Sequence, residues 1–154
     1  MRNEMNEPFT ILVVEDNANE ALLLQKAFKR VNGEIAVHFV ANGEEAIDYL
    51  SGADRFEDRH TYPDPDLLVM DLKMPRKGGF EVLEWFRNLR EGALIPVVIL
   101  TASENDADVE RAYGLGANSY FRKPAAFDEF RDMVKVICDY WSVARRPRAL
   151  ALGQ

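Results

Sequence analysis

The feature that most constrains this chain's fold is a strict alternation of short apolar runs with longer amphipathic stretches. The apolar runs span residues 10–14, 35–40, 67–70, 96–100 and 118–121. Because they are short and rich in β-branched or aromatic residues, they are typical of strands covered on both faces. Helical spacing follows at residues 20–31, 42–50, 80–89, 106–115 and 127–143. This order predicts an α/β fold: a doubly wound, five-stranded parallel sheet with five helices.

Two Asn-x-x-Glu patterns predict where helices begin. Asn17 precedes Glu20 by three residues, and Asn42 precedes Glu45 by the same spacing. In such a capping box, the first side chain accepts a hydrogen bond from the backbone N–H of the Glu, whose own side chain reaches back. We therefore expect both pairs to close the N-terminal ends of their helices.

The length and cysteine content indicate one domain without disulfides. The chain has 154 residues, about the length of one domain, and a single cysteine, Cys138. One cysteine permits neither an internal disulfide nor a Cys-based zinc site. We expect an N-terminal extension over residues 1–8, a globular domain over residues 9–143 and a C-terminal tail over residues 144–154.

Charge and hydropathy disfavour nucleic acid and membrane partners. The formal net charge is −7, whereas a protein that binds nucleic acid needs a basic face. Arg145, Arg146 and Arg148 do cluster, but in the short tail, where solvated side chains are expected. No apolar run reaches the roughly 18 residues of a membrane-spanning helix, and the N-terminus lacks a secretory signal. We therefore expect a cytoplasmic protein.

Polar residues of matching chemistry follow four of the predicted strands. Glu15 and Asp16 follow the first strand, Asp71 the third, Thr101 the fourth and Lys123 the fifth. In a doubly wound sheet the carboxyl ends of the strands lie at one edge, where ligands bind. Each residue alone has an ordinary alternative, such as a helix cap or a surface lysine. Together they predict one site.

The three acids predict a cation site that serves phosphoryl transfer. Grouped carboxylates raise each other's pKa values unless a cation is present. We expect Mg²⁺ as the cofactor, because it takes one or two carboxylates together with phosphate oxygens. Asp71 would be the nucleophile that becomes an aspartyl phosphate. Asp16 would bind the metal most directly, with Glu15 bound directly or through water. Lys123 and Thr101 would bind the phosphate oxygens.

The segment before the third strand is long for a connection in a compact α/β fold. It spans residues 51–66, and loops of that size are usually functional or mobile. We expect it to hold part of the preceding helix and little other regular structure. His60 within it is expected to be solvated rather than a ligand.

These motifs resemble the receiver domains of bacterial two-component response regulators over residues 9–141. The matching segments are VVEDN at 13–17, LLVMDLKMP at 67–75, ILTA at 99–102 and YFRKP at 120–124. The resemblance implies that Asp71 accepts a phosphoryl group from a sensor histidine kinase, so that the chain is a signalling module rather than an enzyme. It also implies that the backbone carbonyl of Lys73 joins Glu15, Asp16 and Asp71 as a metal ligand.

The resemblance further implies a switch and a cis peptide bond. Thr101 and Tyr120 correspond to a pair in which the threonine hydroxyl moves to the phosphate and the aromatic ring turns inward. Pro124 corresponds to a proline whose preceding peptide bond is typically cis. One departure lies in the turn after Asp71, where Gly78-Gly79 stands in place of an acid followed by glycine.

A closer similarity is to the single-domain regulators paired with bacterial and cyanobacterial phytochromes. It rests on the long loop, the turn KMPRKGG at 73–79, the aromatic pair Tyr140-Trp141 and the short tail. The implied kinase is therefore a phytochrome. Because the residues after Val143 are too few for a DNA-binding module, we expect the output to be an altered protein–protein interaction.

The last predicted helix carries more apolar surface than one sheet-facing stripe requires. Met133, Val136 and Tyr140 widen a stripe that already repeats at three- and four-residue spacing. Excess apolar area on a surface helix indicates a partner, and a symmetric dimer is the commonest one. We expect a homodimer through the face of the fourth helix, fifth strand and fifth helix. The predicted contact residues are Phe130, Met133, Ile137, Tyr140 and Trp141.

Three alternatives to this function can be compared with the sequence. A phosphorylation-independent dimer or interaction scaffold remains the alternative, although a degenerate receiver tends to lose one of the site residues that are complete here. A phosphohydrolase of the haloacid dehalogenase type needs a second aspartate two residues after the nucleophile, where this chain has Lys73. A dinucleotide site is disfavoured, because no glycine-rich phosphate-binding motif follows the first strand.

Overall fold

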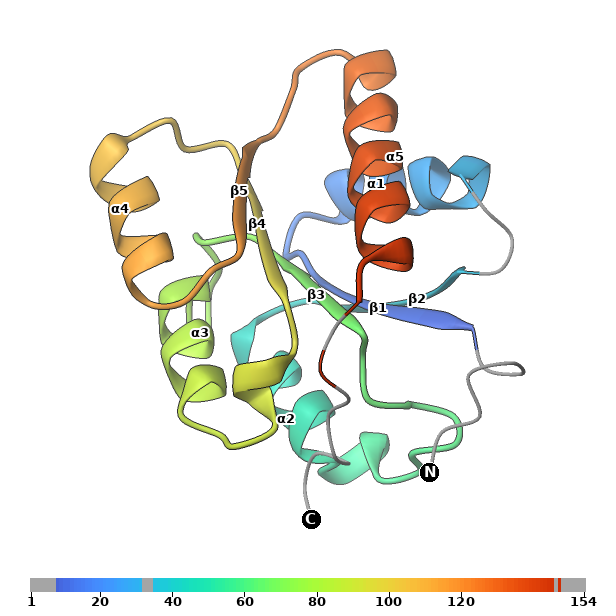
Figure 1. The fold of residues 1–154 in the computed structure, drawn as a ribbon, viewed down its shortest axis with the longest axis vertical. Coiled ribbons are helices and arrows are strands. Elements are labelled where there is room, and N and C mark those ends of the chain that lie inside the picture. Colours follow the sequence, from blue (N-terminus) through green and yellow to red (C-terminus); the bar gives the residue numbers. More distant parts are fainter. Residues whose placement is uncertain (1–7, 32–34, 146, 148–154) are drawn as a thin grey trace.

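The described part of the chain forms one parallel sheet with strand order β2-β1-β3-β4-β5 (Figure 1). The computed structural model describes residues 8–31, 35–145 and 147. Its strands are β1 (Phe9–Val14), β2 (Ile35–Val40), β3 (Leu67–Met70), β4 (Val97–Thr101) and β5 (Ser119–Arg122). The chain runs from β1 to one edge of the sheet and then returns past β1 toward the other edge. This confirms the predicted doubly wound fold.

Helices cover both faces of the sheet. The α-helices of the described residues are α1 (Ala18–Val31), α2 (Gly43–Ser51), α3 (Gly79–Arg87), α4 (Asp106–Gly114) and α5 (Phe127–Val143); 3₁₀ turns occur at η1 (Asp54–Phe56) and η2 (Gly92–Leu94). Figure 1 shows α1 and α5 together on one side of the sheet, with α2, α3 and α4 on the other. Asn42 caps α2 as predicted, because its side chain accepts a hydrogen bond from the Glu45 N–H.

Alternate residues of the central strands pack into separate halves of the core. On β1, Ile11 and Val13 belong to the cluster that α1 and α5 cover, with Phe28 and Val134 among its members. Leu12 belongs to the cluster on the opposite face, with residues of α2 and α3. Since side chains alternate along a strand, a strand covered on both faces must be apolar throughout. This explains why the strand sequences read as continuous apolar runs.

Aromatic packing fixes the long segment between α2 and β3. Its regular structure is limited to the end of α2 and to η1, but the Tyr49 ring is fully buried beneath it. The centroid of the Tyr49 ring lies 5.1 Å from that of Phe56 and 5.9 Å from that of Tyr62. The Tyr49 hydroxyl donates a hydrogen bond to the Pro63 carbonyl at 2.8 Å. The segment is therefore packed against this end of the core and covers it. His60 lies exposed on it, in agreement with its expected solvation.

The exposed face of α5 differs from the predicted partner face. Phe130 and Ile137 are buried in the core beneath α5, with 4% and 2% of their surface exposed. Their inclusion in a partner surface is therefore wrong, because the same helical stripe that suggested a partner packs on the sheet. Met133 and Trp141 are partly buried against that core. Tyr140 is 62% exposed and stays available to a partner.

The helices and strands of the described residues fall within the expected domain, residues 9–143. The expected N-terminal extension, residues 1–8, and tail, residues 144–154, lie outside the described residues except at positions 8, 144, 145 and 147. Within the described ranges, no helix combines the length and the hydropathy that crossing a membrane requires.

The start of α2 contacts the loop after β3 without room for a side chain. A Cβ added at Gly43 would lie 2.1 Å from the carbonyl oxygen of Lys77. We predict that Gly43→Ala lowers the free energy of unfolding by about 1–3 kcal/mol, because backbone atoms must move to accommodate the methyl group. Urea unfolding of the purified variant measures this loss.

Gly114→Ala is the matched control for this prediction. Gly114 ends α4, and a Cβ there would meet no heavy atom within 4 Å. We expect this variant to be at least as stable as the wild type, since alanine favours a helix over glycine. Equal unfolding midpoints for Gly43→Ala and the wild type would contradict the close contact.

Candidate functional site

Four strand ends bring the predicted site residues to one edge of the sheet. Glu15 directly follows β1, Asp71 directly follows β3, Thr101 ends β4 and Lys123 directly follows β5. β1 and β3 are neighbours in the sheet although β2 comes between them in the chain. The space between their carboxyl ends is therefore the switch point where ligands bind in doubly wound sheets.

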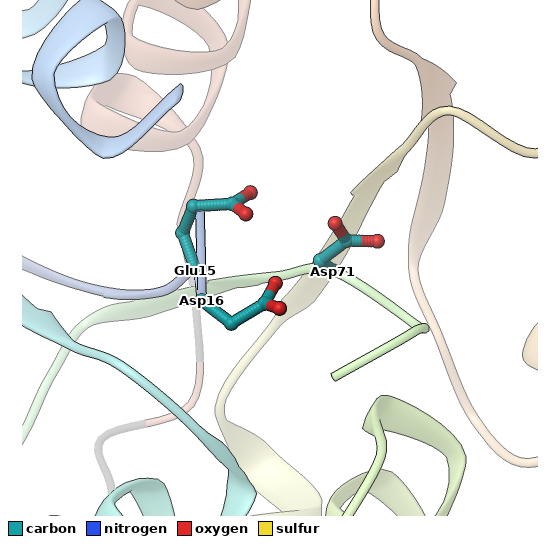
Figure 2. A group of neighbouring side chains, drawn as sticks. All are labelled: Glu15, Asp16 and Asp71. Atoms are coloured by element: carbon teal, nitrogen blue, oxygen red, sulfur yellow. The ribbon is translucent and has the colours of Figure 1, made fainter. Parts of the chain in front are cut away.

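Three carboxylates meet at this switch point (Figure 2). One oxygen each of Glu15, Asp16 and Asp71 lies within 4.8 Å of the others. Glu15 and Asp71 are buried, with 4% and 8% of their surface exposed, whereas Asp16 is open to solvent. In Figure 2 the carboxylates of Glu15 and Asp16 extend toward Asp71. Since carboxylate oxygens and water are the ligands of Mg²⁺ in proteins, this set of donors fits a hard divalent cation.

The ammonium group of Lys123 is the positive charge in contact with these acids. Its Nζ donates hydrogen bonds to Glu15 Oε2 at 2.6 Å, to Glu20 Oε2 at 2.7 Å and to Asp71 Oδ2 at 2.8 Å. Only 5% of the lysine side chain is exposed. An ammonium group has three hydrogens to donate, so these carboxylates use all of them.

Burial and pairing shift the pKa values of two groups in the site. Burial raises the pKa of Glu15 to about 7, although hydrogen bonds from Lys123 and Asn17 act in the opposite direction. Burial also disfavours the charged form of Lys123, but hydrogen bonds to Asp71, Glu15 and Glu20 outweigh it and raise the pKa of the lysine. Lys123 therefore stays protonated at neutral pH, and the ionised form of Glu15 depends on nearby positive charge.

Glu20 makes a contact that its sequence pattern did not predict. Its N–H donates to Asn17 Oδ1 at 3.0 Å, so Asn17 caps α1 as expected. The Asn17 N–H, however, donates to Glu15 Oε1 at 3.1 Å. The reciprocal half of the expected capping box is therefore wrong: Glu15 occupies the donor, and the Glu20 carboxylate binds Lys123 instead. The sequence carries no separate signal for this role, because the capping pattern with Asn17 already accounts for the glutamate.

Backbone and side-chain donors orient the carboxylate of Asp71. Oδ1 accepts a hydrogen bond from the Leu72 N–H at 2.7 Å, and Oδ2 accepts from Lys123. The Lys73 side chain is exposed, and a metal-binding role for its carbonyl stays a prediction. A Cβ on Gly79 would lie 2.3 Å from the Asp71 carbonyl oxygen. Gly79 is thus required in this turn, because its backbone lies too close to that of Asp71 to leave room for a side chain.

Thr101 and Tyr120 are both connected to Ser103. Thr101 is 2% exposed, and its Oγ1 lies 3.5 Å from the Ser103 N–H, which points to it. The Tyr120 hydroxyl donates to the Ser103 carbonyl at 3.0 Å. The predicted switch pair is therefore linked through the backbone after β4. This link carries no recognisable sequence signal.

The peptide bond before Pro124 is trans, since no cis peptide bond occurs among the described residues. The expected cis bond is therefore wrong. A trans bond before proline is favoured by about 0.5–1 kcal/mol unless tertiary contacts reverse the preference. The presence of a proline in the sequence does not show whether such tertiary contacts exist.

A cleft of about 660 Å³ opens beside Lys123. Residues of α1, of the segment after β4, of the end of β5, of the segment between β5 and α5 and of α5 surround it. They are Glu20, Ala102, Arg122, Lys123, Pro124, Ala125 and Glu129. Glu20 therefore both binds the buried ammonium group and contributes to the lining of this open cleft.

Comparisons with known proteins identify relatives of this chain. The response regulator receiver domain family matches residues 11–135. The chain is 36% identical over 138 residues to the probable methanogenesis regulatory protein FilR2 of Methanothrix harundinacea, covering 90% of this chain and 86% of that protein. It is 33% identical over 141 residues to the response regulator Rcp1 of Synechocystis, covering 92% and 94%.

Solved structures of such regulators share the fold. The crystal structure of the phosphorylated cyanobacterial phytochrome response regulator RcpA has a TM-score of 0.85 at 32% identity, covering 92% of this chain and 99% of that one. The Mn²⁺-bound form of Rcp1 has a TM-score of 0.82 at 31% identity, covering 92% and 100%. The predicted similarity to phytochrome-associated single-domain regulators is thus confirmed.

The Lys123 hydrogen bonds lead to a stability prediction. We expect Lys123→Met to lower the free energy of unfolding by about 3–5 kcal/mol, because Glu15 and Asp71 would be left buried without their cation. Urea unfolding at neutral pH without divalent cations measures the loss.

Lys135→Met serves as the control for this change. Lys135 forms an exposed pair with Asp139 at 2.6 Å on α5, and such surface pairs contribute little. This variant should unfold at the wild-type midpoint. A loss of the same size in both variants would contradict the special position of Lys123.

Proposed function

Because this chain belongs to the response regulator receiver family, we propose that it accepts a phosphoryl group on Asp71 from a sensor histidine kinase. The cofactor would be Mg²⁺, held by Glu15, Asp16, Asp71 and the carbonyl of Lys73. The observation that carries the proposal is the contact of Asp71 with both the acidic cluster and Lys123. The output would be an altered interaction with another protein.

The residues of the site support an in-line transfer to Asp71. A carboxylate oxygen of Asp71 would form a bond to phosphorus as the bond from phosphorus to the donor nitrogen breaks. The Leu72 N–H keeps the other carboxylate oxygen in place, because it donates to Oδ1 at 2.7 Å. Lys123 would donate to a phosphoryl oxygen. Mg²⁺, when bound, would offset negative charge on the phosphoryl oxygens and the acids.

Thr101 and Tyr120 would report the transfer to the surface. The Thr101 hydroxyl would move to the phosphoryl group and so change its relation to Ser103. Tyr120 is bound to the same residue through its hydroxyl at 3.0 Å. We therefore propose that a shift of Ser103 carries the change from Thr101 to the partly buried ring of Tyr120.

Two further parts of the proposal concern partners. We propose a phytochrome as the kinase, which the similarity to the phytochrome response regulator RcpA supports. We also propose a homodimer through α5, where Val136, Tyr140 and Val143 are 59%, 62% and 79% exposed. Their spacing of four and three residues places them on one face of the helix. In the proposed interface these exposed residues replace Phe130 and Ile137, which are buried.

The phosphoacceptor proposal predicts uptake that needs both Asp71 and Mg²⁺. Incubation with acetyl phosphate and Mg²⁺ should add one phosphoryl group to the wild type by intact mass. Asp71→Asn should take up none, and chelation of the metal should abolish uptake by the wild type. Asp132→Asn, an exposed residue of α5, should behave as the wild type. No uptake under any condition would favour the phosphorylation-independent scaffold.

The dimer proposal predicts a concentration-dependent mass that depends on the exposed stripe of α5. We expect Tyr140→Glu to shift light-scattering masses toward the monomer, because it places a charge in an apolar contact. Leu94→Glu is the control, since Leu94 is 39% exposed on η2, away from α5. Equal masses for Tyr140→Glu and the wild type would exclude this interface.

A further inference from the structure

The loop between β3 and α3 has a strained tip. The loop spans residues 72–79, and its base is closed by a hydrogen bond from the Gly79 N–H to the Leu72 carbonyl at 2.8 Å. Arg76 and Lys77 have positive φ values of 53° and 76°. Residues other than glycine rarely adopt this conformation, and it persists where surrounding contacts hold it. Contacts from outside the loop must therefore fix its shape.

The first turn of α2 supplies these contacts. The Glu44 N–H donates to the Arg76 carbonyl at 3.0 Å. The Glu44 carboxylate accepts from the Arg76 guanidinium, whose Nε and Nη2 lie 3.0 and 2.9 Å from Oε2. The Lys77 carbonyl lies against Gly43, where a Cβ has no room. The tip of the loop is thus bound to α2 through both backbone and side chain.

The contact also satisfies backbone donors at the start of α2. The first N–H groups of a helix have no acceptor within the helix. In α2 the Asn42 side chain accepts from the Glu45 N–H at 2.9 Å, and the Arg76 carbonyl accepts from the Glu44 N–H. The loop therefore completes the cap of α2, and α2 fixes the loop in return.

The same loop carries two groups of the site. The Leu72 N–H donates to Asp71 Oδ1 at 2.7 Å, and the Lys73 carbonyl is a proposed metal ligand. A backbone carbonyl has no side-chain torsion that could adjust its direction, so the shape of the loop sets it. Mg²⁺ requires nearly ideal octahedral geometry. The affinity for Mg²⁺ should therefore depend on how firmly α2 holds the loop.

We propose that Glu44 and Arg76 are positioning residues for the metal site. Neither belongs to the acidic cluster, and both act through the 72–79 loop. By holding the tip of this loop on α2, the pair keeps the Lys73 carbonyl in the direction that binds the metal. The inference rests on the proposed function and adds to it two residues that set the affinity for Mg²⁺.

Two variants with opposite changes of charge test this inference. Glu44→Gln removes a negative charge and Arg76→Gln a positive one, so charge alone would weaken Mg²⁺ binding in the first and strengthen it in the second. We expect both variants to bind Mg²⁺ about two- to fivefold more weakly, the range that loss of an exposed ion pair allows. The Kd is measured at constant ionic strength by NMR titration, followed through the Leu72 amide signal.

Lys77→Gln is the matched control. It removes the same charge from the next residue of the loop, but the Lys77 ammonium is not part of the pair with Glu44. We expect it to bind Mg²⁺ at least as tightly as the wild type. Arg76→Lys keeps a cation for Glu44 and should bind more tightly than Arg76→Gln. The double variant Glu44→Gln/Arg76→Gln should bind no more weakly than either single variant, because both substitutions remove one contact.

Exchange of the Glu44 N–H with solvent gives a readout that a purely structural role would not change. If the contact with α2 favours metal binding, metal binding must favour that contact to the same extent, because coupling is reciprocal. Saturating Mg²⁺ should therefore slow exchange of this amide in the wild type. The Asp108 N–H, which donates to the Asn105 carbonyl in the first turn of α4, is the internal control and should not respond.

The outcomes distinguish the inference from the proposed function. Equal Kd values for the wild type and both variants, opposite changes in Glu44→Gln and Arg76→Gln, or unchanged exchange of the Glu44 N–H would each overturn the role of the pair. Phosphorylation of Asp71 would then still stand. A wild type that shows no saturable response to Mg²⁺ would overturn the proposed metal site and this inference together.

Discussion

The contact of one buried ammonium group with three carboxylates is the constraint on which the site depends. Lys123 follows β5, whereas its partners Glu15, Glu20 and Asp71 come from the end of β1, from α1 and from the end of β3. Without this cation, acids on neighbouring strand ends would repel one another in a buried position. The contact therefore links the outer strand β5 to the centre of the sheet and keeps the carboxylate of Asp71 in place.

This arrangement leaves the site with more acidic groups than cations, and the excess of negative charge is its main chemical property. Asp16 faces the same space as Glu15 and Asp71 but remains open to solvent. Burial raises the pKa of Glu15, so a bound divalent cation would stabilise its ionised form. Such a site would gain stability when a cation binds, as the proposed phosphoacceptor function requires.

Much of this structure could be predicted from the sequence, because the strands are continuous apolar runs, the helices have a periodic apolar pattern and the site residues lie at strand ends. The sequence predicted which strand ends meet, but not the individual side-chain contacts between other distant segments. Glu20 lies far from Lys123 in the chain, and its capping pattern already gave it a local role. The apolar spacing of α5 showed that Phe130 and Ile137 share a face, but the packing of α1 and α5 on the sheet determined that this face is buried.

Locating the phosphoryl group chemically would test the central claim most directly. Borohydride reduces an aspartyl phosphate to homoserine, so the protein would be phosphorylated with acetyl phosphate and Mg²⁺, reduced, digested and analysed by peptide mass spectrometry. The account predicts homoserine at position 71 and at no other aspartate. Homoserine at Asp16, or phosphorylated protein with an unmodified residue 71, would contradict it.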